Sequence, residues 1–252
     1  MPAASAAAVL SALANPYGMI LVTGPTGSGK TVSLYTGLNI LNTEDRNIST
    51  AEDPAEINLE GINQVNVNNK VGLDFASALR SFLRQDPDII MVGEIRDLET
   101  AEIAIKAAQT GHMVLSTLHT NDAPSAVARL YKMGVEPFLI AYSINIIVAQ
   151  RLIRRLCEKC KRRVEKLDED LMKNAGIKDI TEWENLEIYE AVGCDACNKT
   201  GYKGRMAIHE ALYFTPTIRE MVVRSGVEVD EEAIRKQSKL DGTLNLRESG
   251  FE

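Results

Sequence analysis

An eight-residue segment near the start of the chain has the residue types and spacing of a phosphate-binding loop. It follows an apolar run at residues 19–22 and precedes a helix-compatible stretch. Its glycines let successive backbone N–H groups turn toward a polyphosphate, Lys30 reaches the outer phosphates, and Thr31 offers a hydroxyl to Mg²⁺. The expected ligand is a nucleoside triphosphate. The residues of the predicted site are Gly24, Pro25, Thr26, Gly27, Ser28, Gly29, Lys30 and Thr31.

A second apolar run, residues 89–92, leads to an acid, Glu94. Ligands of open α/β sheets bind at the carboxyl ends of the strands, so Glu94 is the leading candidate to polarise an attacking water. The alternative is an ordinary solvated acid. Many P-loop enzymes place an Asp before this Glu to hold Mg²⁺, but Gly93 occupies that position here. Either another carboxylate supports the metal, or its water shell does so alone.

An acidic cluster, Glu52, Asp53 and Glu56, follows the run at residues 48–51 and is a candidate for that missing support. Acids beside a triphosphate would repel it unless Mg²⁺ lies between them, so proximity would imply a metal or water role. A solvated turn around Pro54 is the competing interpretation.

Histidines stand at both ends of a predicted strand at residues 113–118. His119, at the carboxyl end, is the better candidate for sensing the γ-phosphate or positioning Glu94. His112 is either functional or a hydrogen-bonded structural residue, and His209 is expected to be structural.

Arginines can neutralise the negative charge that develops during triphosphate hydrolysis, and a neighbouring subunit often supplies one. Arg80, Arg84 and Arg96 are the candidates in this half of the chain. Arg96 lies two residues beyond Glu94 and is therefore close enough to matter. A surface ion pair is the alternative for each of them.

Four cysteines form two Cys-x-x-Cys pairs, which matches a tetrahedral structural zinc site. The pairs are separated by 33 residues, so we expect a small helical insert between them. Basic flanking residues disfavour a thioredoxin-like redox role, and four free buried cysteines are the remaining alternative. The predicted ligands are Cys157, Cys160, Cys194 and Cys197.

Elements that position these residues are predicted by alternating β-rich and helix-like segments, the pattern of a mostly parallel sheet flanked by helices. A helix is also expected from Pro137 toward Leu156. We expect an ATP-site core over residues 1–134 and a mainly helical C-terminal subdomain over 135–252 that carries the zinc element at 157–197. The predicted strands are 20–23, 47–51, 62–67, 89–92 and 113–118, and the helices are 30–41, 74–84, 98–109 and 123–133.

Composition indicates a globular protein, since 45% of the 252 residues are hydrophobic and 25% are charged. The net charge of −7 argues against a dominant nonspecific hold on nucleic acid, although the basic stretch 151–163 suits an acidic ligand. No run is long enough for a membrane span, and the alanine-rich start lacks the basic region of a signal peptide. The simplest expectation is a cytoplasmic protein.

Taken together, these motifs resemble the secretion ATPase superfamily that powers type II secretion and type IV pili. The resemblance runs from about Asn15 to about Tyr213 and is closest to the pilus assembly, or extension, motors of the PilB kind. It is carried by GPTGSGKT, STAEDPAE, LRQDPDIIMVGEIRDLETA, TGHMVLSTLHTND and the tetracysteine followed by GYKGR.

By this resemblance the fold is RecA-like and the chain hydrolyses ATP with Mg²⁺. The family's Gly-Glu version of Walker B accounts for Gly93. The implied roles are Walker A for Lys30 and Thr31, the catalytic glutamate for Glu94, the Asp box for Glu52, Asp53 and Glu56, the His box for His112 and His119, and zinc ligands for Cys157, Cys160, Cys194 and Cys197.

The resemblance also implies a homo-hexamer that acts on the cytoplasmic side of the inner membrane with a membrane platform protein. The tetracysteine favours extension or secretion over retraction. Family members carry domains before the P-loop, so a fragment is expected here. Three alternatives stay open: a type II secretion ATPase, a nucleic-acid translocase on a P-loop core, and a scaffold that binds ATP but turns it over too slowly to do work.

Overall fold

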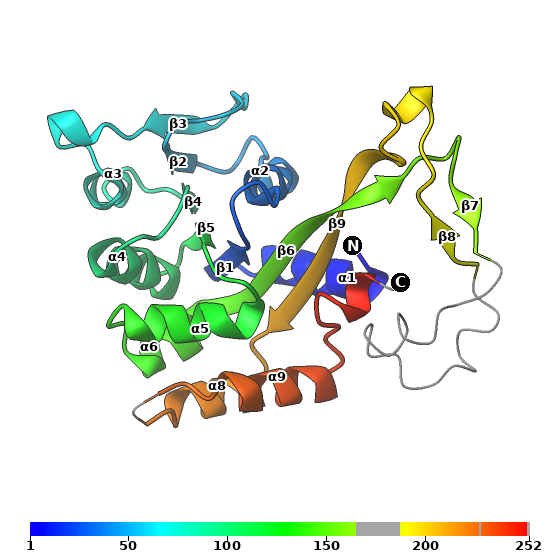
Figure 1. The fold of residues 1–252 in the computed structure, drawn as a ribbon. Coiled ribbons are helices and arrows are strands. Elements are labelled where there is room, and N and C mark those ends of the chain that lie inside the picture. The colour runs from blue at the N-terminus through cyan, green and yellow to red at the C-terminus, as the bar shows by residue number, and fades with distance from the viewer. Residues whose placement is uncertain (165–186, 227, 251–252) are drawn as a thin grey trace. The chain divides into compact units, whose positions relative to one another are not determined.

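A computed structural model describes residues 1–164, 187–226 and 228–250. Its main feature is a sheet with the strand order β3-β2-β4-β5-β1-β6-β9 (Figure 1). β1 pairs in parallel with both β5 and β6, and β2 pairs in parallel with β3 and β4. The strands are β1 Gly18–Thr23, β2 Ile48–Glu52, β3 Asn63–Asn66, β4 Ile89–Val92, β5 Met113–Leu118, β6 Ile144–Leu156 and β9 Tyr202–Tyr213.

Helices connect most of these strands, as parallel neighbours require. The five strands and four helices predicted before residue 134 are confirmed, with ends that differ by a few residues. The structure adds α1, whose alanines favour a helix, at the start of the chain. The helices are α1 Ala3–Leu13, α2 Lys30–Leu41, α3 Phe75–Phe82, α4 Leu98–Gln109, α5 Ala123–Lys132, α6 Pro137–Ser143, α8 Pro216–Val223 and α9 Glu231–Leu240.

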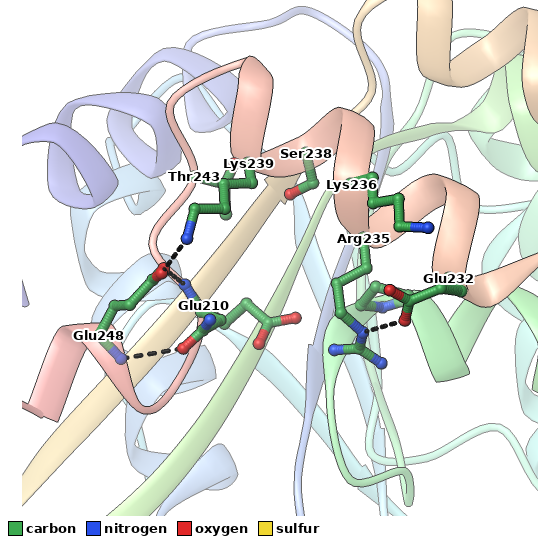
Figure 2. A pocket seen from close by; sticks show the side chains of 10 residues that line it. Glu210, Glu232, Arg235, Lys236, Ser238, Lys239, Thr243 and Glu248 are labelled. Atoms are coloured by element: carbon green, nitrogen blue, oxygen red, sulfur yellow. Dashed lines mark hydrogen bonds and ion pairs between the residues drawn. The ribbon is translucent and has the colours of Figure 1, made fainter. Parts of the chain in front are cut away.

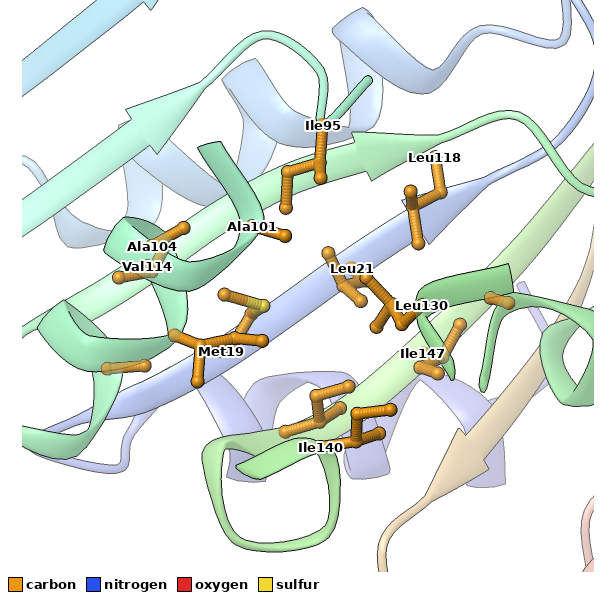
Figure 3. Close-up of a cluster of buried hydrophobic side chains, with 14 of the residues drawn as sticks. Met19, Leu21, Ile95, Ala101, Ala104, Val114, Leu118, Leu130, Ile140 and Ile147 are labelled. Carbon is orange, nitrogen blue, oxygen red and sulfur yellow. The ribbon is translucent and has the colours of Figure 1, made fainter. Parts of the chain in front are cut away.

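Both faces of the sheet are covered, which explains why its central strands are apolar throughout rather than alternating. On β1, Met19 and Leu21 face a cluster that includes α3 to α6, whereas Ile20 and Val22 face a second cluster with α1 and α2. Figure 3 shows the first cluster, in which Met19 and Leu21 lie among side chains of α4, α5, α6 and β6. This packing fixes the direction in which β1 delivers the segment that follows it.

The helix predicted from Pro137 to Leu156 is wrong beyond Ser143, where β6 begins. Residues 144–148 include four β-branched residues that favour a strand. Pairing with β1 places Ile146 opposite Ile20 and Val148 opposite Val22, and all four side chains are buried. The residues after 134 therefore contribute two long strands as well as helices.

Two compact units can be distinguished, one formed by residues 1–151 with 207–252 and the other by residues 152–206. The predicted boundary at 134/135 falls between α5 and α6, inside the first unit. In the second unit, the short strands β7 (Arg162–Arg163) and β8 (Tyr189–Glu190) pair antiparallel. The helical insert predicted between the cysteine pairs falls largely on residues 165–186, outside the described residues.

None of the helices in the described ranges combines the length and the apolar character needed to cross a membrane.

Candidate functional site

The predicted phosphate-binding loop connects β1 to α2 and depends on its glycines. Gly24, Gly27 and Gly29 have φ angles of +150°, +77° and +86°, which side chains rarely allow. A Cβ atom on Gly24 would lie 2.4 Å from the backbone oxygen of Gln150, whereas one on Gly27 would meet nothing within 4 Å. The loop is therefore packed tightly against β6 at its start and open at its middle.

Lys30 begins α2 and folds its side chain back over this loop. Its Nζ donates to the carbonyl oxygens of Gly24, at 2.9 Å, and of Pro25, at 3.2 Å. Burial lowers the pKa of Lys30, and the nearby charge of Glu94 opposes that shift. Ser28 Oγ is buried and has no hydrogen-bond partner within the described residues. A buried ammonium and an unpaired hydroxyl at the start of a helix fit a phosphate group. Thr31 follows in the first turn of α2.

Glu94 lies just beyond β4 at the same edge of the sheet. Its Oε1 pairs with Arg96 Nη2, and its Oε2 lies 3.6 Å from His119 Nε2, just beyond β5. Arg96 Nη1 lies 3.7 Å from Asp53 Oδ2, just beyond β2. The hydrogen bond to Glu94 raises the pKa of Arg96. Three neighbouring strands thus bring Asp53, Glu94, Arg96 and His119 together.

Neighbouring strands also clamp the backbone before Glu94. Gly93 N donates to Ala51 O at 2.8 Å, and Thr117 Oγ1 donates to Gly93 O at 2.7 Å. A Cβ on Gly93 would lie 3.3 Å from Ala51 O, so the residue lies in close contact with β2. Because Gly93 has no side chain, its backbone can stay this close to Ala51 on β2.

The acidic cluster divides into residues with different surroundings. Glu52 is buried and accepts hydrogen bonds from Tyr35 O–H, from Thr50 Oγ1 at 2.6 Å and from Gln64 Nε2 at 2.9 Å. The pKa of Tyr35 is raised by burial and by its bond to Glu52. Glu56 is exposed, and its backbone N–H donates to Tyr35 Oη at 3.1 Å. Among the described residues, Asp53 is the member of the three that forms an ion pair with the cluster around Glu94.

The remaining sequence candidates lie elsewhere. His112 is at the opposite end of β5, where its Nδ1 lies 3.1 Å from Ala107 O at the end of α4, so this geometry favours the structural alternative. His209 is buried on β9. Arg80 forms an exposed ion pair with Glu99.

Gln150 and Tyr35 are buried polar residues that sequence reasoning missed. Gln150 Nε2 donates to Ser28 O at 2.8 Å, and its Oε1 accepts from Ser33 Oγ at 2.5 Å. The available signal was a polar residue that ends the apolar run 144–149. It becomes informative only when that run is recognised as a strand beside β1.

The four cysteines are unbonded to one another and form a single cluster whose Sγ atoms all lie within 4.8 Å. The Sγ pairs 157–194, 160–197 and 194–197 are separated by 3.9, 3.8 and 3.8 Å. Ligands about 2.3 Å from a central metal in a tetrahedron lie about 3.8 Å apart, whereas a disulfide requires about 2.05 Å. This group could therefore hold a metal ion.

Backbone amides surround the sulfur atoms, as a thiolate cluster requires. Gly193 N lies 3.4 Å from Cys160 Sγ, and the N–H groups of Cys194 and Gly201 each lie 3.2 Å from Cys197 Sγ. The N–H donors of Cys194 and Gly201 lower the pKa of Cys197 to about 6. Burial raises the pKa of Cys160 to about 12. Four thiolates in one cluster need a cation to balance their charge.

A polar pocket of about 140 Å³ lies beside β9 and α9 (Figure 2). Glu210 is buried there and accepts from the backbone N–H groups of Ala123 and Leu246, while Lys239 pairs with Glu248 at 2.6 Å. Burial raises the pKa of Glu210. These charged groups bind the protein's own backbone and each other. Their contacts connect the region of α9 to Ala123 at the start of α5.

Fold and site together define a P-loop α/β protein in which a glycine-rich loop between β1 and α2, a strand-end glutamate and a cluster of four cysteines that could hold a metal occur in one chain. The family described as "Type II/IV secretion system protein" matches residues 1–251, and the chain belongs to this family.

The chain is similar to ATPases of the type IV pilus and type II secretion machines. It is 59% identical to the type IV pilus assembly ATPase PilB of Acinetobacter baylyi, over 96% of this chain and 41% of that protein. The PilB of Pseudomonas aeruginosa is 60% identical over 96% of this chain and 42% of its own length. The type II secretion system ATPase E of Vibrio cholerae is 49% identical over 94% and 46%. The chain thus spans about two fifths of the length of these relatives.

Among solved structures, the pilus retraction motor PilT with bound ADP matches 99% of this chain and 59% of its own, with a TM-score of 0.69 and 28% identity. This likeness supports the RecA-like P-loop fold that the resemblance implied.

Proposed function

We propose that this chain is the ATP-hydrolysing motor region of a type IV pilus assembly machine. The observation that carries the proposal is the grouping of side chains at the carboxyl ends of the neighbouring strands β4, β5 and β1. There the P-loop with Lys30, Glu94 beyond β4 and His119 beyond β5 converge. Three PilB relatives are 56–60% identical to the chain and a fourth is 50% identical, whereas the type II secretion relatives are 45–52% identical, and this difference favours pilus assembly.

In this proposal the P-loop N–H groups and Lys30 bind the phosphates of ATP. Glu94 orients and polarises the attacking water by accepting a hydrogen bond from it, and His119 and Arg96 hold the Glu94 carboxylate in place. Thr31 and Asp53 are the hydroxyl and carboxylate that would hold Mg²⁺, directly or through its waters, since hard oxygen ligands suit that ion. Bound Mg²⁺ neutralises charge on the phosphates.

The cysteine cluster would hold Zn²⁺, because four Cys ligands at tetrahedral spacing are typical of structural zinc. Its role is to tie the two Cys-x-x-Cys turns into one unit. As further proposals that follow from the family resemblance, the whole protein acts as a homo-hexamer in the cytoplasm and is bound to the inner membrane through a platform protein.

A segment exchange tests the biological assignment. The matching segment of the Acinetobacter baylyi PilB is replaced by this chain, and pilus extension is measured. The same exchange is made in the type II ATPase of Vibrio cholerae, with secretion as the readout. Restored pili without restored secretion supports the proposal. The reverse result supports the type II alternative, and ATP hydrolysis strongly stimulated by DNA supports the translocase.

A further inference from the structure

Gln150 is a polar side chain that the proposed chemistry does not use, although it is only 3% exposed. It stands one residue beyond Ala149, which is paired with Thr23 at the end of β1. β6 runs parallel to β1 and continues to Leu156, beyond the end of β1 at Thr23. Gln150 is therefore placed beside the start of the P-loop.

The contacts of Gln150 reach both sides of the loop. Its amide Nε2 donates to Ser28 O at 2.8 Å, and its Oε1 accepts from Ser33 Oγ at 2.5 Å. Its own backbone oxygen lies where a Cβ on Gly24 would clash at 2.4 Å. One residue thus touches the beginning of the loop, its fifth residue and the first turn of α2.

We propose that Gln150 is a positioning residue that holds the P-loop in its phosphate-binding conformation. The peptide unit is planar and trans, so the Ser28 oxygen and the Gly29 N–H point in opposite directions. When Gln150 draws that oxygen toward β6, the Gly29 N–H is turned away from β6 and toward the side on which phosphate binds. Gly27 and Gly29 have no side chains to stabilise this orientation, so an external hydrogen bond does.

This role predicts a specific kinetic pattern, and it rests on the proposed ATP site. The loop N–H groups contact phosphate in both the ground state and the transition state, so loosening them weakens binding without selectively slowing chemistry. In Gln150→Met the Kd and KM for Mg·ATP should rise at least tenfold, with kcat within threefold of wild type. Binding is measured with a fluorescent ATP analogue and hydrolysis by phosphate release.

Gln150→Glu gives a second readout that a purely structural role would not produce. The ionised carboxylate cannot donate to Ser28 O, whereas the protonated acid can. Burial raises the pKa of such a carboxyl above its ordinary value of about 4.3, so the ATP affinity of this variant should recover as pH falls toward that raised pKa, and Gln150→Met should show no such recovery.

Asn145→Asp is the matched control, because Asn145 is also on β6 and its Nδ2 donates to a backbone oxygen, that of Tyr17, at 3.0 Å. That contact lies at the start of β6 and before β1, away from the P-loop, so ATP affinity should change less than twofold. If Gln150→Met fails to fold, Ser33→Ala removes one of the two contacts without altering the sheet and should raise Kd about threefold.

ATP binding by folded Gln150 variants within twofold of wild type would overturn the inference, as would an equal loss in Asn145→Asp. Failure of the wild-type chain to bind Mg·ATP would instead overturn the proposed function. The two failures are therefore distinguishable.

Discussion

At the scale of single residues, the cluster around Glu94 shows why charged groups at strand ends have different roles. Asp53 and Glu52 are adjacent in sequence, yet Glu52 is buried under three donors and Asp53 faces Arg96. Successive side chains of a strand point to opposite faces, and β2 ends at Glu52. The side chains of Glu52 and Asp53 therefore lie in different surroundings. Arg96 contacts both Glu94 and Asp53 and is the residue that joins two of the strand ends.

Arg96→Ala should reduce kcat for ATP hydrolysis by roughly 10- to 100-fold, because the Glu94 carboxylate loses the group that orients it. ATP affinity should change little. Arg80→Ala is the matched control, since Arg80 forms an ion pair with Glu99 that is exposed on both sides. Equal losses in the two variants would show that Arg96 is only a surface cation.

Glu52→Ala should destabilise the protein by about 2–4 kcal/mol, because three donors, two of them the buried Tyr35 and Thr50, lose their acceptor. Urea unfolding measures this loss. The neighbouring variant Glu56→Ala should unfold at the wild-type urea concentration, since its side chain is exposed. If Glu52→Ala instead retains full stability and loses only hydrolysis, the catalytic role predicted from sequence is the better account of Glu52.

The P-loop, Glu94 and His119 were predictable because each follows an apolar run that ends at the same edge of a parallel sheet. Gln150 and Tyr35 were not, because their importance depends on which strand or helix they lie against. No glycine or second proline separates Pro137 from the run at residues 144–148, so the local pattern predicts a single helix that starts at that proline and continues through the run. The conformation of residues 144–148 is decided by strand pairing with β1 rather than by the local sequence.

At the scale of elements, β9 contributes a buried histidine to the first unit. Burial, with a smaller contribution from the chain's amino terminus, lowers the pKa of His209 to about 4. Histidine in an unfolded chain has a pKa of about 6.5. As pH falls below that value, His209 becomes protonated in the unfolded state but stays neutral in the folded state. Stability contributed by neutral His209 is therefore present above about pH 6.5 and lost as pH falls toward 4.

His209→Leu should remove this dependence, because Nδ1 makes no hydrogen bond within the described residues that leucine would forfeit. Between pH 7 and pH 4, wild type should lose about 3 kcal/mol more unfolding free energy than the variant. Urea unfolding across that range measures the difference, and the carboxylates common to both chains cancel. Parallel pH profiles would mean that His209 is accessible to protons in the folded state.

The cysteine turns of the second unit supply another prediction at this scale. Purified protein should contain about one zinc per chain, and Cys194→Ser should lose most of it, because a neutral hydroxyl replaces one of four thiolates. Asp195→Asn changes the adjacent exposed charge and should retain the metal. Metal analysis of both proteins is the measurement. A full zinc content in Cys194→Ser would show that the cluster is not the metal site.

At the scale of the whole molecule, the order of strands has a consequence for how the protein is made. β1 is synthesised before β5 and β6, yet it lies between these two strands, whose residues come about a hundred positions later. Pairings between such distant segments form slowly, and the Gln150 contact to Ser28 spans 122 positions. A chain still emerging from the ribosome therefore carries the P-loop sequence long before it carries a P-loop. Nucleotide capture would mark the point in biosynthesis at which the sheet has closed around β1.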